Sequence, residues 1–300
     1  MSQLPRVRAA CATHLCLPQA ADMPALLLSL LTSAVAAGPS LDVTPWNSTT
    51  DRLLLYTLGK TGSTSLELAF GCLTGRSRLP FVRNIAADGI WRDDQYLALE
   101  TPPRGFKTHV ASVAQRMVEM VRPQDTNLWM IIPVRDTLAR AMSDFFETLD
   151  TQYVGPAVRN WSLAQIMSRY KTLEPHMVGR SIIDTLQQVL GERVDWLPRF
   201  DPSSHDLWAV RGTLRLLIVR AEDSTHWPSI VERRMGVDIR LPSAANSGED
   251  KWYGELYQAF KSGYVSEVET VRRALKSTDM RLLYTEDETN RFAASALHLR

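Results

Sequence analysis

Residues 51–73 read DRLLLYTLGKTGSTSLELAFGCL, and this stretch indicates the fold class of the chain. It opens with a short aliphatic run, residues 51–58, of the kind that forms a buried strand. After the glycine-rich centre, the apolar side chains of Leu66, Phe70 and Leu73 recur at helical spacing. We therefore expect the loop at residues 59–65 to join a strand to a helix.

This loop carries the groups that hold an anion. The first N–H groups of a helix lack intrahelical partners and lie at the positive end of the helix dipole, so they bind phosphate or sulfate oxygens. Gly59 allows close approach of the backbone, and Lys60 adds a positive charge. The residues that we predict to contact the anion are Lys60, Thr61, Gly62, Ser63, Thr64 and Ser65. The alternative is a Ser/Gly-rich connection with an exposed lysine.

The rest of the chain alternates between strand and helix patterns. Further strands are predicted at 128–134 and 213–219, and helices at 109–122 and 137–149. Such alternation favours an α/β fold with a mainly parallel sheet. We predict a P-loop-like three-layer fold, in which helices flank a mainly parallel central sheet.

Two other segments do not belong to this alternation of strands and helices. Apolar residues at steps of three and four predict one long helix over 252–275. The stretch 152–204 is rich in Trp, Pro and Arg around two short helical patterns, and we interpret it as an insertion or a cap on the substrate side.

The composition describes an ordinary globular chain. It has 300 residues, is 45% hydrophobic and carries a formal charge of +1, so no global field favours nucleic acid. An acidic ligand must therefore be held by local groups. The three cysteines have no spacing typical of a zinc site, and we expect neither a metal nor a disulfide framework.

The first 45 residues differ from the rest. An apolar run of about 14 residues within 23–38 is short for a membrane span and fits the core of a signal peptide. Residues 1–45 form a leader, which could be a signal segment, a membrane anchor or a disordered segment. We predict an α/β domain at 46–300. A signal or anchor would place the protein in the secretory pathway or at a membrane, and otherwise we expect it in the cytoplasm.

A second motif follows the strand at 128–134. Residues 131–147 read IIPVRDTLARAMSDFFE, with Arg135 at the carboxyl edge of the strand, where open α/β sheets collect ligands. Asp136 or Thr137 can cap the next helix. Arg135 and Ser143 then supply a guanidinium and a hydroxyl that suit a phosphate. Alternatively, Arg135 pairs with a local carboxylate and Ser143 is a small interior residue.

Together the two motifs resemble the cofactor site of sulfotransferases that use 3′-phosphoadenosine 5′-phosphosulfate (PAPS). The resemblance implies that the loop holding Lys60, with the residues through Ser65, contacts the 5′-phosphosulfate. It also implies that Arg135 and Ser143 hold the 3′-phosphate. The family has proline where this chain has Thr137, a departure that affects the rigidity of the loop and not its charge.

The C-terminal half narrows this resemblance. Residues 216–236, LLIVRAEDSTHWPSIVERRMG, and 245–261, ANSGEDKWYGELYQAFK, are similar to a branch of the superfamily associated with capsular polysaccharide synthesis. The resemblance spans about 51–264. It implies a glycan or polysaccharide acceptor. The near-neutral charge gives no reason to expect a nucleic-acid partner, and we expect membrane association only through 23–38.

Sulfuryl transfer requires a base for the acceptor proton and a positive charge near the leaving oxygen. Lys60 suits the second task. For the base, we predict His109 in GFKTHVASVAQRM, residues 105–117, where Thr108 would cap a helix whose first turn holds His109. His109-Val110 also resembles a His-Val pair whose histidine is the base in glycan sulfotransferases. A structural capping role for His109 is the alternative, and Glu67 and Lys107 are candidates for supporting roles.

Two other functions remain open. A nucleotide-dependent phosphotransferase would need a magnesium carboxylate, for which Asp136 is the candidate. However, the Walker A pattern fails because Leu54 stands where a glycine is required. The other alternative is a non-catalytic protein that binds an anion or a nucleotide.

Overall fold

The computed structural model describes residues 45–47, 49–74, 79, 84–85, 91–92, 96–97, 104–121, 126–242 and 251–298. The elements below belong to one compact unit, residues 43–300. Apart from Pro45, the leader predicted at 1–45 lies outside the described residues. Among the described helices, none combines the length and the apolar character that a membrane span requires.

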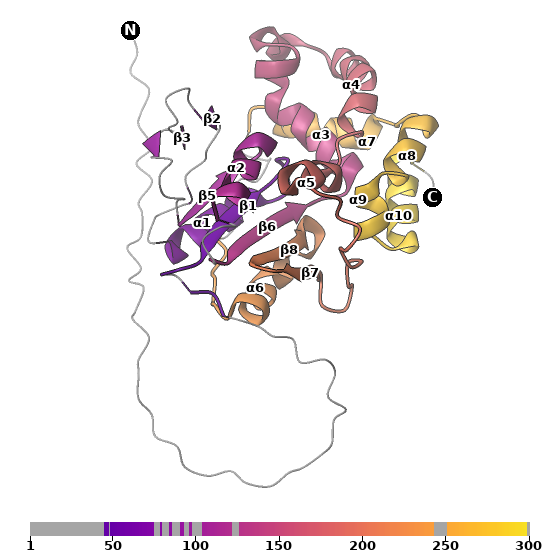
Figure 1. The fold of residues 1–300 in the computed structure, drawn as a ribbon. Coiled ribbons are helices and arrows are strands. Elements are labelled where there is room, and N and C mark those ends of the chain that lie inside the picture. Colours follow the sequence, from indigo (N-terminus) through magenta and orange to yellow (C-terminus); the bar gives the residue numbers. More distant parts are fainter. Residues whose placement is uncertain are drawn as a thin grey trace, which may run out of the picture. The chain divides into compact units, whose positions relative to one another are not determined.

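A five-stranded sheet with the strand order β5-β1-β6-β8-β7 forms the centre of this unit (Figure 1). The strands are β1 (Arg52–Tyr56), β5 (Gly105–Thr108), β6 (Leu128–Val134), β7 (Asp206–Arg211) and β8 (Leu214–Arg220). Four of them run parallel, and β7 pairs antiparallel with β8 at one edge. A short second sheet consists of β2 (Asn84–Ile85), β3 (Trp91–Arg92) and β4 (Tyr96–Leu97).

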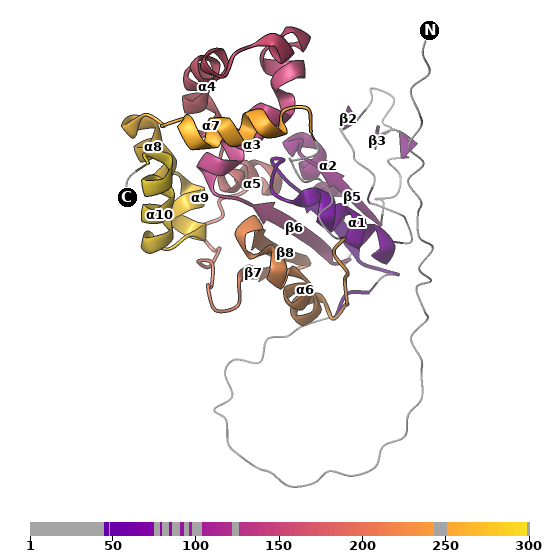
Figure 2. The same cartoon turned by 180° about the vertical axis from the view of Figure 1, so that it is seen from behind.

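Helices cover both faces of the large sheet, as the opposite views in Figures 1 and 2 show. Side chains alternate along a strand, so Met130 and Ile132 of β6 belong to one apolar cluster, and Trp129 and Ile131 to the other. The first cluster includes α2 (Ala111–Val121), α5 (Ile182–Leu190) and α9 (Thr278–Leu283). The second includes α1 (Ser63–Leu73) and α6 (Trp227–Met235). The predicted α/β fold with a mainly parallel sheet flanked by helices is confirmed.

A third apolar cluster joins helices to one another. It includes α3 (Thr137–Thr148), α4 (Leu163–Met177), α7 (Gly254–Gly263), α8 (Val268–Leu275) and α10 (Glu286–Ala296). In both ribbon views α3, α4 and α7 lie together beyond the end of the sheet where α3 begins (Figures 1 and 2). The interpretation of 152–204 as an insertion or cap is wrong for its second half, because α5 is part of the core against the sheet.

The single helix predicted over 252–275 is wrong, because two helices, α7 and α8, form there. Between them, Tyr264 is extended, and its hydroxyl donates to Glu174 of α4 at 2.9 Å. The hydroxyl of Ser266 donates to the same carboxylate at 2.6 Å. Glu174 is buried, so these two bonds satisfy a charge that would otherwise be costly. The apolar spacing does not reveal this partner, which comes from another helix.

Replacement of Glu174 by alanine should therefore destabilise the protein. The variant would leave two hydroxyls without their acceptor and open a small cavity, so we expect the free energy of unfolding to fall by about 2–4 kcal/mol. Chemical denaturation measures this change. As a control, Glu269→Ala on the exposed side of α8 should stay within about 0.5 kcal/mol of the parent. A loss below about 1 kcal/mol for Glu174→Ala would contradict the role given to this carboxylate.

Candidate functional site

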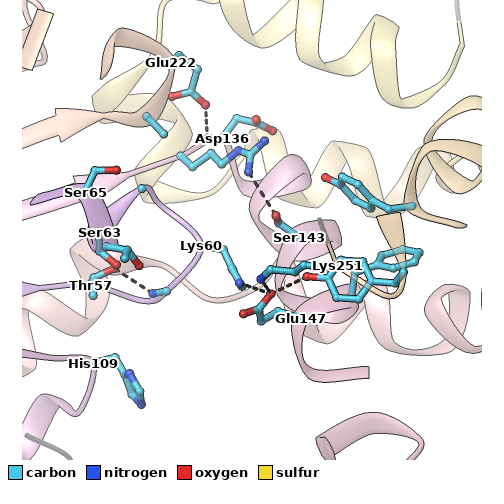
Figure 3. A pocket seen from close by; sticks show the side chains of 18 of the residues that line it. Thr57, Lys60, Ser63, Ser65, His109, Asp136, Ser143, Glu147, Glu222 and Lys251 are labelled. Atoms are coloured by element: carbon cyan, nitrogen blue, oxygen red, sulfur yellow. Dashed lines mark hydrogen bonds and ion pairs between the residues drawn. The ribbon is translucent and has the colours of Figure 1, made fainter. Parts of the chain in front are cut away.

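The central strands β1 and β6 are neighbours, but the chain leaves them in opposite directions. Strand β5 follows β1 on one side, and β8 follows β6 on the other. At such a switch point, open α/β sheets have a crevice at the carboxyl ends of the strands. A pocket of about 870 Å³ is lined by residues that follow four parallel strands, including Lys60 after β1, His109 after β5, Arg135 after β6 and Glu222 after β8 (Figure 3).

Most of the predicted site residues come together in this pocket. Its lining includes Lys60, Gly62, Ser63, Thr64, Ser65, His109, Arg135 and Ser143. Lys107 also lines it. Glu67 does not, and its carboxylate instead forms an ion pair with Lys107 at 2.9 Å. Thr61 is buried behind the loop.

The loop between β1 and α1 has an unusual backbone. Gly59 and Lys60 both have positive φ angles, 86° and 56°, and a lysine rarely adopts this conformation. The hydroxyl of Thr57 accepts a hydrogen bond from the Gly59 N–H at 2.9 Å and contacts the hydroxyl of Thr61 at 2.8 Å. Thr57 and Thr61 therefore hold the loop in this conformation from its buried side.

Gly62 has no room for a side chain. Its φ angle is +77°, and a Cβ atom would lie 2.7 Å from the ring of Trp227 in α6. Helix α1 begins at the next residue, Ser63, and the Ser65 N–H donates to the Gly62 carbonyl at 3.1 Å. The preceding N–H groups of this first turn have no intrahelical acceptor, as at any helix start. Close packing on Trp227 thus places a helix N-terminus against the pocket.

The second predicted motif lies on the other side of the crevice. Asp136 caps α3, since its carboxylate accepts from the Ala139 N–H at 2.9 Å. Arg135 donates to the hydroxyl of Ser143 at 3.4 Å. Within the described part of the chain, Arg135 forms no salt bridge, although its charge interacts with the nearby carboxylates of Asp136 and Glu222.

Glu222, which follows β8, holds the start of α3 in place. Its carboxylate accepts from the Asp136 N–H at 2.9 Å and from the Tyr284 hydroxyl at 3.2 Å. Burial raises the pKa of Glu222, and it also raises the pKa of Asp136 against the opposing effect of the Ala139 N–H. Both carboxylates have structural partners on the wall of the pocket.

The structure corrects the local position of His109. Helix α2 begins at Ala111, and the Thr108 hydroxyl accepts from the Val110 N–H at 3.0 Å. His109 therefore lies in the connection ahead of the helix and not in its first turn. Figure 3 shows its ring on the pocket side that is remote from Glu222. The His109 ring nevertheless lines the pocket.

Sequence patterns did not identify a cluster centred on Glu147 of α3. Its Oε2 atom contacts the Lys60 ammonium at 2.7 Å, the Lys251 ammonium, and the Tyr253 hydroxyl at 2.5 Å. Burial by itself would raise the pKa of Glu147, but the bonds from Lys251, Lys60 and Tyr253 outweigh it and lower the pKa to about 2. Burial is also the main reason that the pKa of Lys60 is lowered, while Glu147 opposes that change.

One local signal could have indicated Glu147. It lies four residues after Ser143 and therefore on the same face of α3. Lys251 and Tyr253 had no comparable signal, because they approach the pocket from a segment more than a hundred residues further along the chain. Their position depends on how α7 packs against α3, through Phe146 and Tyr257, whose ring centroids are 5.0 Å apart.

Among the residues that the structure describes, no group of three or more His, Cys, Asp or Glu side chains could hold a metal ion. Comparison of the chain with protein-family models, with curated proteins and with solved structures finds no match. The chemistry is therefore inferred from the geometry of the site and from the motifs themselves.

Gly62→Ala should damage the site more than a glycine substitution elsewhere. The new methyl group meets the Trp227 ring, so either the loop or α6 must move, and we expect a loss of about 2–4 kcal/mol in unfolding free energy. Binding of pyrophosphate, measured by calorimetry, should fall below detection. Gly191→Ala is a matched control: its φ is +68° with no atom nearby, so we expect about 1 kcal/mol and unchanged binding. Equal effects of the two variants would contradict this role for Gly62.

Proposed function

We propose that this protein is a sulfotransferase that moves a sulfuryl group from PAPS to a hydroxyl of a glycan or polysaccharide. The proposal rests on one observation: two motifs that suit anions line the same pocket, at the switch point of the sheet. One motif is the Lys60 loop, and the other is Arg135 with Ser143. The glycan acceptor rests on the resemblance of residues 216–236 and 245–261, and the P-loop-like character of the fold rests on the Lys60 loop.

The pocket fits a ligand with two separate anionic groups. The first turn of α1, with Lys60 and the hydroxyls of Ser63, Thr64 and Ser65, offers donors suited to a 5′-phosphosulfate. Across the crevice, Arg135 and Ser143 offer a guanidinium and a hydroxyl suited to a 3′-phosphate. A volume of about 870 Å³ is near the upper end of the range for small-molecule pockets, which leaves room for part of an acceptor.

The side chains of the pocket can support in-line transfer. When bound, PAPS supplies the sulfuryl group: its bond to the phosphate oxygen breaks as a bond to the acceptor oxygen forms. Lys60 stabilises negative charge on the departing oxygen, as cations do in phosphoryl transfer. His109 accepts the acceptor proton, provided that its ring is neutral. Both residues line the pocket.

The alternatives of a phosphotransferase and a non-catalytic binding protein lead to different measurements. The Asp136 carboxylate, which a phosphotransferase would use for magnesium, already caps α3. The sulfotransferase proposal predicts that adenosine 3′,5′-bisphosphate binds without magnesium and that radiolabelled sulfate passes from PAPS to a member of a glycan panel. Tight binding of ATP that depends on magnesium would favour a phosphotransferase. Bisphosphate binding without transfer to any glycan would favour a binding protein.

Arg135→Ala should weaken the binding of adenosine 3′,5′-bisphosphate. Loss of a charge-assisted contact to a phosphate typically costs about 2 kcal/mol, which corresponds to a roughly thirtyfold higher Kd. Isothermal titration calorimetry measures the change. The control Arg116→Ala removes the same charge from the exposed side of α2 and should leave the Kd unchanged. Unchanged affinity in Arg135→Ala would place the 3′-phosphate elsewhere.

His109→Ala separates an enzyme from a binding protein. If the ring faces the acceptor and not the nucleotide, bisphosphate affinity should remain, while turnover falls about 10²- to 10⁴-fold, as is typical of a lost general base. A melting curve, a titration and an initial rate on one working acceptor test this. A structural role would instead lower the melting temperature, and binding and activity would decline together. Normal melting with turnover within about threefold of the parent would exclude His109 as the base.

A further inference from the structure

The Glu147 cluster consists of Lys60, Glu147, Lys251 and Tyr253, and it joins three separate parts of the fold. Lys60 belongs to the loop after β1, Glu147 to α3, and the other two to the segment that leads into α7. All three donors converge on a single carboxylate oxygen, Oε2 of Glu147. Figure 3 shows both lysine side chains reaching this carboxylate.

The cluster brings two like charges together. Because both ammonium groups contact the same oxygen atom, they cannot be further apart than the sum of their two contact distances. Lys251 therefore repels Lys60 and contributes to its lowered pKa, after burial as the main cause. A single carboxylate compensates only one of the two charges, so the cluster retains a net positive charge that faces the pocket.

Stability alone does not account for this arrangement. The side chains of Lys60 and Lys251 are each 22% exposed and that of Glu147 is 32% exposed, and ion pairs with such solvent access contribute little to stability. A structural ion pair also needs only one cation. Lysine and arginine side chains placed around a transferred group, in contrast, stabilise the negative charge of its transition state.

We propose that Lys251 is a second cationic residue of the transfer site, held beside Lys60 by Glu147. This assignment rests on the proposed sulfotransferase function and adds a residue to it. In sulfuryl transfer, negative charge lies on the oxygens of the moving group and on the departing oxygen. Lys60 and Lys251 would hold these oxygens together, and Glu147 is a positioning residue that keeps the two ammonium groups in place.

Binding of two related nucleotides tests the role of Lys251. PAPS carries the sulfuryl group, and adenosine 3′,5′-bisphosphate lacks it. Lys251→Met should therefore raise the Kd of PAPS by about tenfold or more. The Kd of the bisphosphate should rise by less than about threefold. Calorimetry provides both values without any acceptor. Lys171→Met, which removes an exposed lysine of α4, is the charge-matched control and should change neither Kd.

The outcomes separate this inference from the function on which it rests. If the parent protein binds neither nucleotide, the proposed sulfotransferase function fails, and the role of Lys251 fails with it. If the parent binds both and Lys251→Met weakens both equally, or neither, the function stands and the assignment of Lys251 is wrong. A larger loss for PAPS than for the bisphosphate supports both.

The pH dependence of PAPS binding tests the positioning role of Glu147. The groups that act directly on the charge of Lys60 are Glu147 and Asp144 on α3 and Lys251 ahead of α7. The other charged and titratable groups that line the pocket are Lys107, His109, Arg135, Asp136, Glu222, Tyr253, Tyr257 and Lys261. Glu147 favours protonated lysine, so its loss lowers the pH at which a lysine gives up its proton. In Glu147→Gln, PAPS affinity should therefore decline at a lower pH than in the parent.

Two further variants keep this test specific. Glu147→Asp retains the negative charge and should move the pH midpoint back toward that of the parent. Tyr253→Phe removes only a hydroxyl and should leave the midpoint in place. An unchanged midpoint in Glu147→Gln, with a normal melting curve, would overturn the positioning role.

Discussion

The parallel pairing of β1 with β6 is the constraint on which the rest of the site depends. Leu53 lies opposite Trp129 in this pair, so both strands end at the same edge of the sheet. Because the chain continues from them in opposite directions, the loops that follow must diverge, and a crevice remains between them. The Lys60 loop and Arg135 would not meet if β5, or any other strand, lay between β1 and β6.

The carboxylates that line the pocket have two different roles. Buried carboxylates such as Glu222 and Asp136 are bound to backbone N–H groups and hold the wall of the pocket. Glu147, in contrast, is partly exposed and is bound to lysines that also line the pocket. A low pKa keeps Glu147 ionised near neutral pH, so it can orient two cations without removing their net positive charge.

Local patterns predicted the strands β1, β6 and β8, because the apolar runs at 51–58, 128–134 and 213–219 are recognisable from a few neighbouring residues. They failed where a distant partner intervenes. The helix expected over 252–275 is interrupted because Glu174 binds Tyr264 and Ser266. Strands β5 and β7 were not predicted from their local sequences, and β5 has only four residues.

The order of residues in the chain was sufficient to indicate an α/β fold and the two motifs, since strand, glycine loop and helix follow one another within about twenty residues. Packing alone placed Lys251 and Tyr253 beside Lys60, because α7 reaches the pocket through contacts with Phe146 of α3. It also placed His109 ahead of α2 and not inside it. A sequence pattern records spacing along the chain, whereas charges interact through space, and the shared contacts of Glu147 exist only once the elements have packed.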